Sequence, residues 1–494
     1  MSLNTTSTPV TALRAFTVGL MVTYAAIGAA AVRGVWDAAV LGLGLLCLLA
    51  VTLPVFIRKN YHLLEPATPL AALVGVCVNV KLLYILWFRG RSNNVDERLL
   101  LGQSTEVLIF GTCMVAIALL LFSLGYFVSV RIDLKWLFQP RRSDWSRKQV
   151  LLVLGAVLFV SACFLLLFIV SAGVSFGSAE ELSQKRFAKQ GTGSAGRIHS
   201  LLYYYYRLAG LAKLVFVVGL AWMVRTKRGV LSLEAAIVAT AGLMSLLICM
   251  VVSNRAGVVL LLLDAGLIWF LVRGHVSLVK LTLLGAGAMA LIMFLLFIRA
   301  GANHTFFELT EKTLAGRDLM DLSKTCHIVN AVPHTIEYRY GETLVGWLAA
   351  PVPRSIWRGK PMWAERGVYL TRYIYGDRLG FTGMPPGLIA ELYWNLGWFG
   401  VIPGMFLCGV IWRAFFEGFR RNQNNLNAIV IYVLVVNRAL LFTFGLDLGS
   451  GILKAALDVI PFLGIVLLVS RSPSTETKSV HPVSDFGRKA LAAN

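Results

Sequence analysis

The residues best suited to chemistry lie in the segment 350–361, APVPRSIWRGKP, where three cationic side chains stand among three prolines. Guanidinium groups stay charged and bind phosphate oxygens through paired hydrogen bonds. Proline fixes φ and interrupts helices, so we expect a stiff loop. Arg354, Arg358 and Lys360 could therefore hold a pyrophosphate without a metal ion. Contact with lipid headgroups explains the same charges equally well.

Two further arginines stand next to apolar runs. Arg255, in MVVSNRAGVV, lies between two such runs with almost no loop to solvate it, and Arg299 follows the next run at a similar depth. A charge in such a place is costly unless it is paired or faces a polar cavity. Both are candidate anion ligands, although Arg255 could also snorkel to the membrane surface.

Proton acceptors are numerous but unspecific. The long segment after Arg299 offers histidines and carboxylates, among which His334 is a candidate base although a structural role is commoner for any one histidine. Glu391 differs because it stands in the apolar stretch GLIAELYWNLGWFG, where a carboxylate must meet a polar partner. Glu391 is therefore a candidate base or a structural residue that holds Arg354. Trp357 could stack on sugars.

The elements that must position these residues are membrane helices. The chain has 494 residues, of which 57% are hydrophobic and 14% charged, and its mean hydropathy is +0.73. These values exclude an ordinary soluble protein. The net charge of +21 is typical of cytoplasmic loops that face anionic lipid, and it does not require nucleic acid as a partner. The seven cysteines form neither a disulfide framework nor a paired metal motif, so no metal or cofactor is expected.

Apolar runs predict an all-α polytopic protein with about twelve transmembrane helices in one domain over 1–494. We expect no cleaved leader, and we expect a cytoplasmic tail over 471–494. The expected spans are 13–32, 36–57, 66–88, 105–130, 149–174, 201–224, 230–252, 256–272, 276–298, 396–416, 427–444 and 451–470.

Basic residues set the expected orientation. The loop 131–148 holds six basic residues against two acidic ones and should be cytoplasmic. Alternation from this loop places both termini and the other strong basic clusters on the cytoplasmic side. It exports 177–200, the turn at 253–255 and a long loop over 299–386. We expect two short amphipathic helices within 306–329, near the membrane surface.

Four stretches carry a resemblance to a known family: SNRAG at 253–257, GRDLMDL at 316–322, YRYGETLVGWLAAPVPRSIWRGKP at 338–361, and TGMPPGLIAELYWNLGWFGVIPG at 382–404. In this order they resemble the oligosaccharide repeat-unit polymerases, the O-antigen polymerase (Wzy-type) family. Before residue 250 the resemblance is mostly one of hydropathy.

The resemblance implies a metal-independent glycosyltransferase of GT-C type in the bacterial inner membrane. Such enzymes transfer a growing glycan from undecaprenyl pyrophosphate to the sugar end of a new lipid-linked repeat unit at the periplasmic face, with a chain-length regulator as partner. The family's arginine in the short outward turn matches Arg255, and its proline-bounded basic motif matches Arg354 and Lys360. The motif where the chain returns to the membrane matches Glu391 and Asn395, which makes Asn395 a candidate sugar ligand.

Three other functions stay open, one of which is a non-enzymatic assembly scaffold that would leave Arg255 unexplained. An O-antigen ligase would use the same donor with lipid A core as acceptor. A lipid-linked oligosaccharide flippase would make no bond, and it should bury basic residues within its helices along a central path. In this sequence the charges gather in the long loop, which favours the polymerase.

Overall fold

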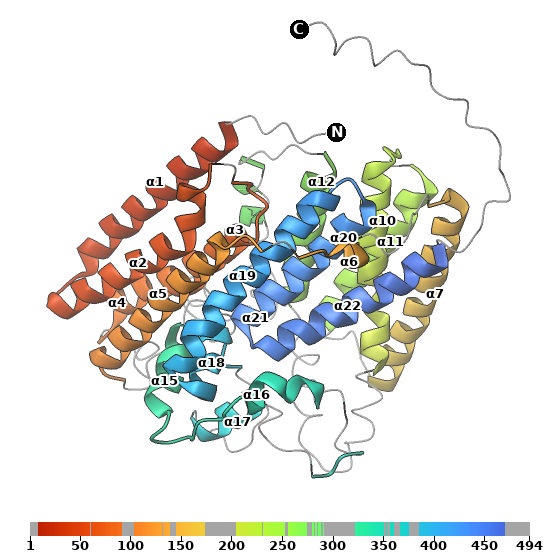
Figure 1. Cartoon of the computed structure of the whole chain (residues 1–494). Helices are drawn as coiled ribbons and strands as arrows, with labels where there is room; N and C mark the ends of the chain where they lie inside the picture. Colours follow the sequence, from red (N-terminus) through yellow and green to blue (C-terminus); the bar gives the residue numbers. More distant parts are fainter. Residues whose placement is uncertain are drawn as a thin grey trace, which may run out of the picture.

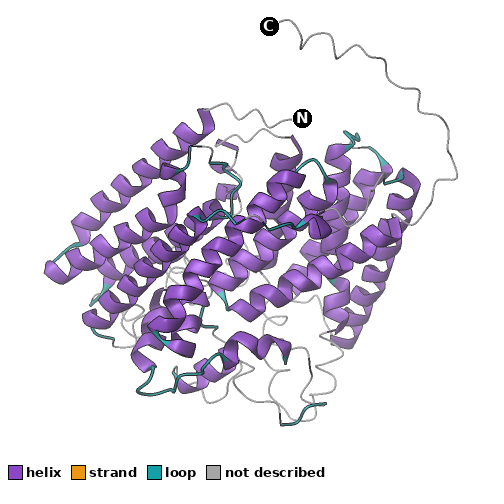
Figure 2. Ribbon diagram, in the orientation of Figure 1, coloured by secondary structure: helices purple, strands orange, loops and turns teal. Residues whose placement is uncertain are grey.

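The structure is a computed structural model that describes most of the chain. The described residues are 8–59, 61–90, 103–130, 132–138, 145–172, 204–229, 231–251, 255–273 and 385–469, parts of 279–290, and, within the long loop, 322–349, 352, 356–359 and 366–374. Every regular element in these ranges is a helix (Figure 2). Ten of the helices are long and apolar enough to cross a membrane, so the chain is an all-α multi-pass membrane protein.

The N-terminal third forms a bundle of four spans. Its elements are α1 (Thr8–Ala31), α2 (Val35–Ile57), α5 (Thr105–Phe127) and one continuous span made of α3 (Ala67–Val74), the π-helix η1 (Gly75–Val80) and α4 (Lys81–Phe88). Ser104 begins α5 by accepting a hydrogen bond from the backbone N–H of Val107. In η1, Asn79 Nδ2 donates to the Gly44 carbonyl of α2 at 2.7 Å, which joins two neighbouring spans.

The middle of the chain adds a second group of helices. After the short α6 (Lys135–Phe138) come α7 (Arg147–Ala172), α10 (Leu211–Arg225), α11 (Leu233–Val251) and α12 (Arg255–Arg273). The helix of α10 starts earlier as a span, at Tyr204. In this group α10 is central, because it packs against α7, α11 and α12 (Figure 1).

The C-terminal part completes the bundle. Its spans are α19 (Trp398–Asn422), the continuous helix of α20 (Leu426–Val435), π-helix η5 (Val436–Leu440) and α21 (Leu441–Gly445), and α22 (Leu448–Val469). The α20 helix is the most enclosed span and contacts α10, α12, α19 and α22. It therefore links the two groups of helices, and its π-helical turn is of a kind that often marks a functional position.

Short helices cover one end of the bundle. These are α15 (Leu322–Ala331), α16 (Glu342–Val345) followed by the 3₁₀ turn η3 (Gly346–Leu348), α17 (Arg366–Tyr373) and α18 (Leu388–Leu396), and Figure 1 shows them along its lower edge. α15 packs against α5 and α18, while α16 packs against α18 and α22. The described part of the long loop thus lies folded on the helices.

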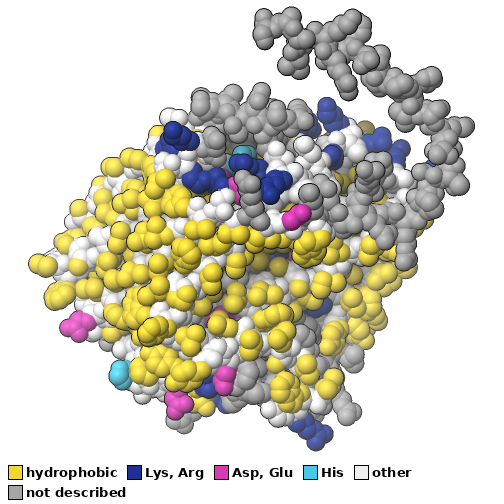
Figure 3. Space-filling view, viewed as in Figure 1, with side chains coloured by type: hydrophobic (Ala, Val, Ile, Leu, Met, Phe, Trp, Pro, Cys, Tyr) yellow, Lys and Arg dark blue, Asp and Glu magenta, His cyan; other side chains and the backbone are white. Residues whose placement is uncertain are grey.

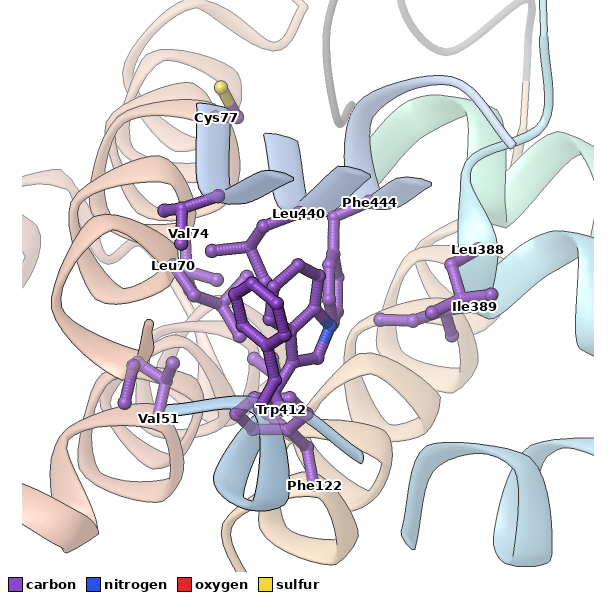
Figure 4. Packing of buried hydrophobic residues seen from close by; sticks show 14 of the residues in the cluster. Val51, Leu70, Val74, Cys77, Phe122, Leu388, Ile389, Trp412, Leu440 and Phe444 are labelled. Atoms are coloured by element: carbon purple, nitrogen blue, oxygen red, sulfur yellow. The ribbon is translucent and has the colours of Figure 1, made fainter. Parts of the chain in front are cut away.

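Glycines allow α5 and α19 to lie in close contact. A Cβ added at Gly409 of α19 would stand 2.0 Å from the Phe122 carbonyl oxygen, and one added at Gly125 of α5 would stand 2.0 Å from that of Phe406. Small residues permit such backbone approach between membrane helices. Beside this seam the core is filled by large side chains, including the edge-to-face pair of Phe122 and Phe444, with Trp412 near them (Figure 4).

Basic side chains gather at the other end of the bundle, above a broad apolar band (Figure 3). There Glu65, fully buried between α2 and α3, accepts hydrogen bonds from Arg58, Arg413 and Tyr126. Burial raises the pKa of Glu65, while the two arginines oppose that rise. The two ion pairs and the Tyr126 hydrogen bond join the end of α2 to α5 and α19. The basic loops predict that this end of the bundle faces the cytoplasm.

The expected topology agrees with the described helices in most places. Ten of the twelve expected spans are found within a few residues, and the helix expected at 256–272 is present as α12. The expected span at 276–298 and the tail 471–494 lie largely or wholly outside the described residues. Of the two short helices expected within 306–329, the described residues show helix α15 from Leu322, with nearly every residue buried against neighbouring helices, and the rest of that segment lies outside the described residues.

Cysteine labelling tests the orientation. In a protein whose native cysteines are replaced, His334→Cys should react with a membrane-impermeant maleimide in intact spheroplasts, because His334 is exposed near the short helices. Leu231→Cys, exposed between α10 and α11, should react only after the membrane is opened. The opposite pattern would show that the chain is inserted the other way round.

Candidate functional site

The structure describes only some of the residues that the sequence singles out. Arg299, Arg354 and Lys360 lie outside the described residues, and so does the side chain of Arg255, whose backbone begins α12. His334 is exposed in the turn after α15, and Trp357 is 41% exposed. The predicted meeting of these groups around a pyrophosphate therefore stays a prediction.

Glu391 and Asn395 are brought together on α18, one turn apart and both fully buried. Glu391 Oε1 accepts the hydroxyl of Thr343 at 3.0 Å, and Oε2 accepts the backbone N–H of Leu448 at 2.8 Å. Asn395 Nδ2 donates to Thr343 Oγ1 at 2.6 Å and to the Glu391 carbonyl at 2.7 Å. We call Thr343, Glu391, Asn395 and Leu448 the α18 clamp, because they fasten α16 and the start of α22 to α18.

Backbone hydrogen bonds extend this contact. The N–H groups of Arg339 and Tyr340 donate to the carbonyls of Trp394 and Asn395, and the N–H of Gly341 donates to Asn395 Oδ1, each at 3.0 Å. Gly341 adopts φ of +92°, a left-handed conformation that favours glycine. Both the oxygen and the nitrogen of the Asn395 amide are therefore hydrogen-bonded to groups of the fold, and these bonds hold the loop. The sequence had instead suggested Asn395 as a sugar ligand.

The hydrogen bonds of the Glu391 carboxylate hold neighbouring segments in place. Each of its two oxygens already accepts a hydrogen bond from a group of the fold, and the residue is enclosed. A buried carboxylate is stable when its lone pairs are met in this way. The geometry favours the structural alternative for Glu391, and it names Thr343 and Leu448 as the partners that were not foreseen.

A cluster of aromatic residues adjoins the clamp. The rings of Tyr369 and Trp394 stack with centroids 5.5 Å apart, and the Arg339 guanidinium lies 4.6 Å from the centroid of Tyr369. The half-exposed ring of Tyr373 is tilted against that of Tyr369, with centroids 4.4 Å apart, and Tyr340 is 79% exposed. Aromatic faces beside a cation suit stacking on flat ring faces and hydrogen bonding to hydroxyl groups.

Tyr338 and the buried Tyr393 continue this cluster toward α19. Their ring centroids are 6.4 Å apart, and Tyr393 meets Trp398 edge to face. Burial, and then the neighbouring Tyr338, raises the pKa of Tyr393, so its hydroxyl keeps its proton at neutral pH. We call Tyr338, Arg339, Tyr369, Tyr373, Tyr393 and Trp394 the aromatic cluster, in which Trp394 and Tyr393 are buried and Tyr373 is exposed.

A second group of polar residues lies inside the bundle. Arg438 of η5 is 3% exposed; its Nη2 donates to Asp264 Oδ2 of α12 at 2.7 Å, and its Nε donates to Asp458 Oδ2 of α22 at 2.8 Å. Asn437 Nδ2 donates to the other oxygen of Asp264 at 2.6 Å. Three spans are thus joined by one guanidinium, whose Nη1 is buried with no hydrogen-bond partner among the described residues.

Further cations stand near Arg438. Lys213 of α10 interacts electrostatically with Arg438, Asp264 and Asp458, and Lys454 of α22 interacts with Arg438 and Lys213. We call Lys213, Asp264, Arg438, Lys454 and Asp458 the intramembrane cluster. Charges within membrane helices are rare and mark functional positions by default.

The intramembrane cluster was not predicted from the sequence. Beside the charges of the long loop, the described helices enclose Arg438 and Asp264 as well. The available signal was one or two charged residues within each of four apolar runs. Read singly, each residue could snorkel or lie near a helix end, and nothing in the linear order shows that the four runs meet.

Helix α22 connects the clamp with the intramembrane cluster. Its first residue, Leu448, is held by Glu391, and Asp447 caps it by accepting the N–H of Ser450 at 2.7 Å. At 1.5 Å per residue, Lys454 and Asp458 follow Leu448 by about 9 and 15 Å along the helix. A change at the clamp would therefore move the start of the helix that carries two charges of the cluster.

Neither a search for metal-binding clusters nor comparison with known proteins assigns a function to further residues. In the part of the chain that the structure describes, no group of three or more His, Cys, Asp or Glu side chains is placed to hold a metal ion. No protein-family model, curated protein or solved structure matches this chain.

Proposed function

We propose that this membrane protein is a glycosyltransferase that polymerises oligosaccharide repeat units carried on undecaprenyl pyrophosphate. The observation that carries the proposal is the aromatic cluster, which lies at the end of the bundle assigned to the periplasm and has the Arg339 guanidinium over the rings of Tyr369 and Trp394. Trp394 is buried and supports these rings, whereas Tyr373 is exposed. An exposed ring close to a guanidinium suits a polar, ring-shaped ligand presented next to a membrane. The four stretches that resemble O-antigen polymerases support the same substrate class.

The proposed reaction assigns separate tasks to the parts of the chain. The glycan leaves one lipid pyrophosphate and joins a hydroxyl of the next repeat unit, so negative charge builds on the pyrophosphate and a proton leaves the hydroxyl. We assign the charge to Arg255, Arg354 and Lys360, as the resemblance suggests, and to Arg299, which follows an apolar run at a similar depth. His334 stays a candidate base, and Trp357 a candidate sugar contact. Glu391 and Asn395 position the loop.

In this proposal the protein works in the bacterial inner membrane, with both termini in the cytoplasm and a chain-length regulator as partner. Deletion of the gene should leave surface glycan capped with single repeat units, which gel electrophoresis of extracted glycan would show. Loss of all glycan from the core would instead identify a ligase. Restoring the gene should restore long chains, and a variant with Arg354→Ala should stay in the membrane without restoring them.

The intramembrane cluster favours a second candidate, a flippase for lipid-linked oligosaccharides. Basic residues enclosed within helices are what transport of an anionic headgroup requires, and Arg438 with Lys213 fits that description. A flippase mutant should accumulate lipid-linked repeat units that face the cytoplasm. Protection of these units from a membrane-impermeant glycosidase in inside-out and right-side-out vesicles would separate the two functions.

A further inference from the structure

The buried guanidinium of Arg438 holds helices together, but only two of its three nitrogens donate to a described acceptor. Two of its nitrogens donate to Asp264 and Asp458. Its Nη1 is buried and meets no hydrogen-bond acceptor among the described residues. Because an arginine keeps its charge and a buried donor without an acceptor is destabilising, this nitrogen is expected to face an acceptor in the working protein.

Lys213 supplies a second donor in the same region. It lies on α10, its ammonium makes no ion pair within 4.0 Å among the described residues, and it interacts electrostatically with Arg438, Asp264 and Asp458. Lysine is a strong point charge for phosphate, and arginine adds a directed hydrogen bond. An anion between Nη1 of Arg438 and the ammonium of Lys213 would satisfy both groups.

The position of the cluster suits a group that comes from the end of the bundle with the short helices. Lys213 follows the start of its span at Tyr204 by about 14 Å, and Lys454 follows the start of α22 by about 9 Å. Arg207, closer to the same end of the span of α10, interacts electrostatically with Lys454. Cations thus continue from that end to about the middle of a hydrocarbon layer some 30 Å thick.

We infer that Arg438 and Lys213, with Lys454 beside them, form an intramembrane binding site for the diphosphate group of a lipid. The site differs from the loop residues assigned to the reaction, and its two acidic members keep it from binding every anion equally. That the lipid carries a polyprenyl tail is inferred from the proposed function. That its headgroup is a diphosphate is inferred from the donors of Arg438 and Lys213.

The structural alternative is that Arg438 only neutralises Asp264 and Asp458. In that case Lys213 has no ligand, and its charge can be removed without effect on binding. Lys213→Met keeps the length of the side chain and breaks no ion pair among the described residues, so this variant should fold. Arg438→Gln also removes the free donor, but it leaves two carboxylates behind and is the less safe variant.

Arg413 offers a matched control. It is also a buried guanidinium, 8% exposed, and it pairs with Glu65 and Glu417 at the opposite end of the bundle. Arg413→Gln therefore disturbs a similar pair of carboxylates without touching the proposed site. A loss of binding in Arg438→Gln and Lys213→Met, but not in Arg413→Gln, would locate the ligand.

The experiment uses the full chain in nanodiscs of phosphatidylcholine. Radiolabelled undecaprenyl pyrophosphate is titrated, and each variant is first checked for a single elution peak. We expect Kd to rise at least tenfold in Lys213→Met and more in Arg438→Gln, with Arg413→Gln within about twofold of the unaltered protein. Inorganic pyrophosphate in excess should compete. Unchanged binding in Lys213→Met, or equal competition by phosphatidylglycerol, would overturn the inference.

Its failure is separable from failure of the proposed function. If the deletion strain still makes long glycan chains while Lys213→Met loses binding, the site stands and the polymerase does not. If the deletion strain stops at single repeat units while Lys213→Met binds and extends chains normally, the polymerase stands and the site does not.

Discussion

The Gly409→Val protein should lose the packing of α5 against α19 and unfold at a clearly lower temperature than the unaltered protein. A Cβ at this position would lie 2.0 Å from the Phe122 carbonyl oxygen and 2.8 Å from the Tyr126 nitrogen, where ordinary contact begins at 3.4 Å. Backbone atoms of a packed helix cannot rotate away as a side chain can. The two helices must therefore separate by more than an ångström along their seam.

The cost is expected to be at or above the usual range for overpacked cores, about 1–3 kcal/mol. Separation also removes contacts of Phe122, which is fully buried and meets Phe444 edge to face. Thermal unfolding followed by size-exclusion chromatography in detergent would measure the effect. Gly155→Ala is the control, because a Cβ on this α7 glycine meets nothing within 4 Å.

Gly125 gives a test of the mechanism. Its Cβ would meet the Phe406 carbonyl at 2.0 Å from the other side of the same seam. Once one added Cβ has separated the two helices, the second Cβ requires little further separation. The losses of stability caused by Gly125→Ala and Gly409→Ala should therefore not be additive in the double variant. Additive costs, or a Gly409→Val protein as stable as Gly155→Ala, would contradict the close approach of the two helices.

The helices themselves were predictable because each one carries its own signal. About 20 consecutive apolar residues specify a span wherever it lies in the bundle, and α2, α5 and α7 are found close to their expected limits. The short helices of the long loop were harder. The helical spacing of apolar residues within 306–329 predicted short amphipathic helices, and α15 is one helix there. The spacing could not predict that α5 and α18 pack against α15 and bury nearly all of it.

The candidate site was predictable only where one residue was anomalous by itself. Glu391 stood out as a carboxylate in an apolar stretch, and the structure indeed provides polar partners for it. The identity of these partners was not predictable, since Thr343 is 48 residues away and Leu448 is 57 residues away. The ion pair of Arg438 and Asp264 was still harder to predict, because neither residue indicates a site unless the two are known to be close to each other.

Glu391→Gln should keep chain extension within about tenfold of the unaltered protein, if Glu391 positions the loop and does not act as the base. The amide oxygen of glutamine can accept the Leu448 N–H, and its NH₂ group can donate to Thr343 Oγ1. The lost charge weakens two hydrogen bonds, which are worth about 1.5–3 kcal/mol with a charged partner and about 1 kcal/mol without. A general base replaced by an amide would instead lose about 10²–10⁴ in rate.

Two companion variants separate stability from chemistry. Glu391→Ala removes the acceptor of a buried N–H and the partner of Thr343, so this protein should be destabilised by about 3 kcal/mol or more. Thr343→Val keeps the shape of its side chain and leaves the carboxylate in place. Chain extension by membranes that contain equal amounts of each protein, together with the unfolding temperature, would be measured.

The decisive comparison is between Thr343→Val and Glu391→Gln. In the clamp the hydroxyl of Thr343 accepts from Asn395 and donates to Glu391, so its loss loosens α16 against α18 as the Glu391→Gln change does. The two variants should then resemble each other in both unfolding temperature and activity. If Glu391 were the base, Thr343→Val would extend chains almost normally while Glu391→Gln would be nearly inactive at an unchanged unfolding temperature. Because α22 begins at this clamp and carries Lys454 and Asp458, a loosened clamp should also weaken pyrophosphate binding at the intramembrane cluster, which a lost base would leave unchanged.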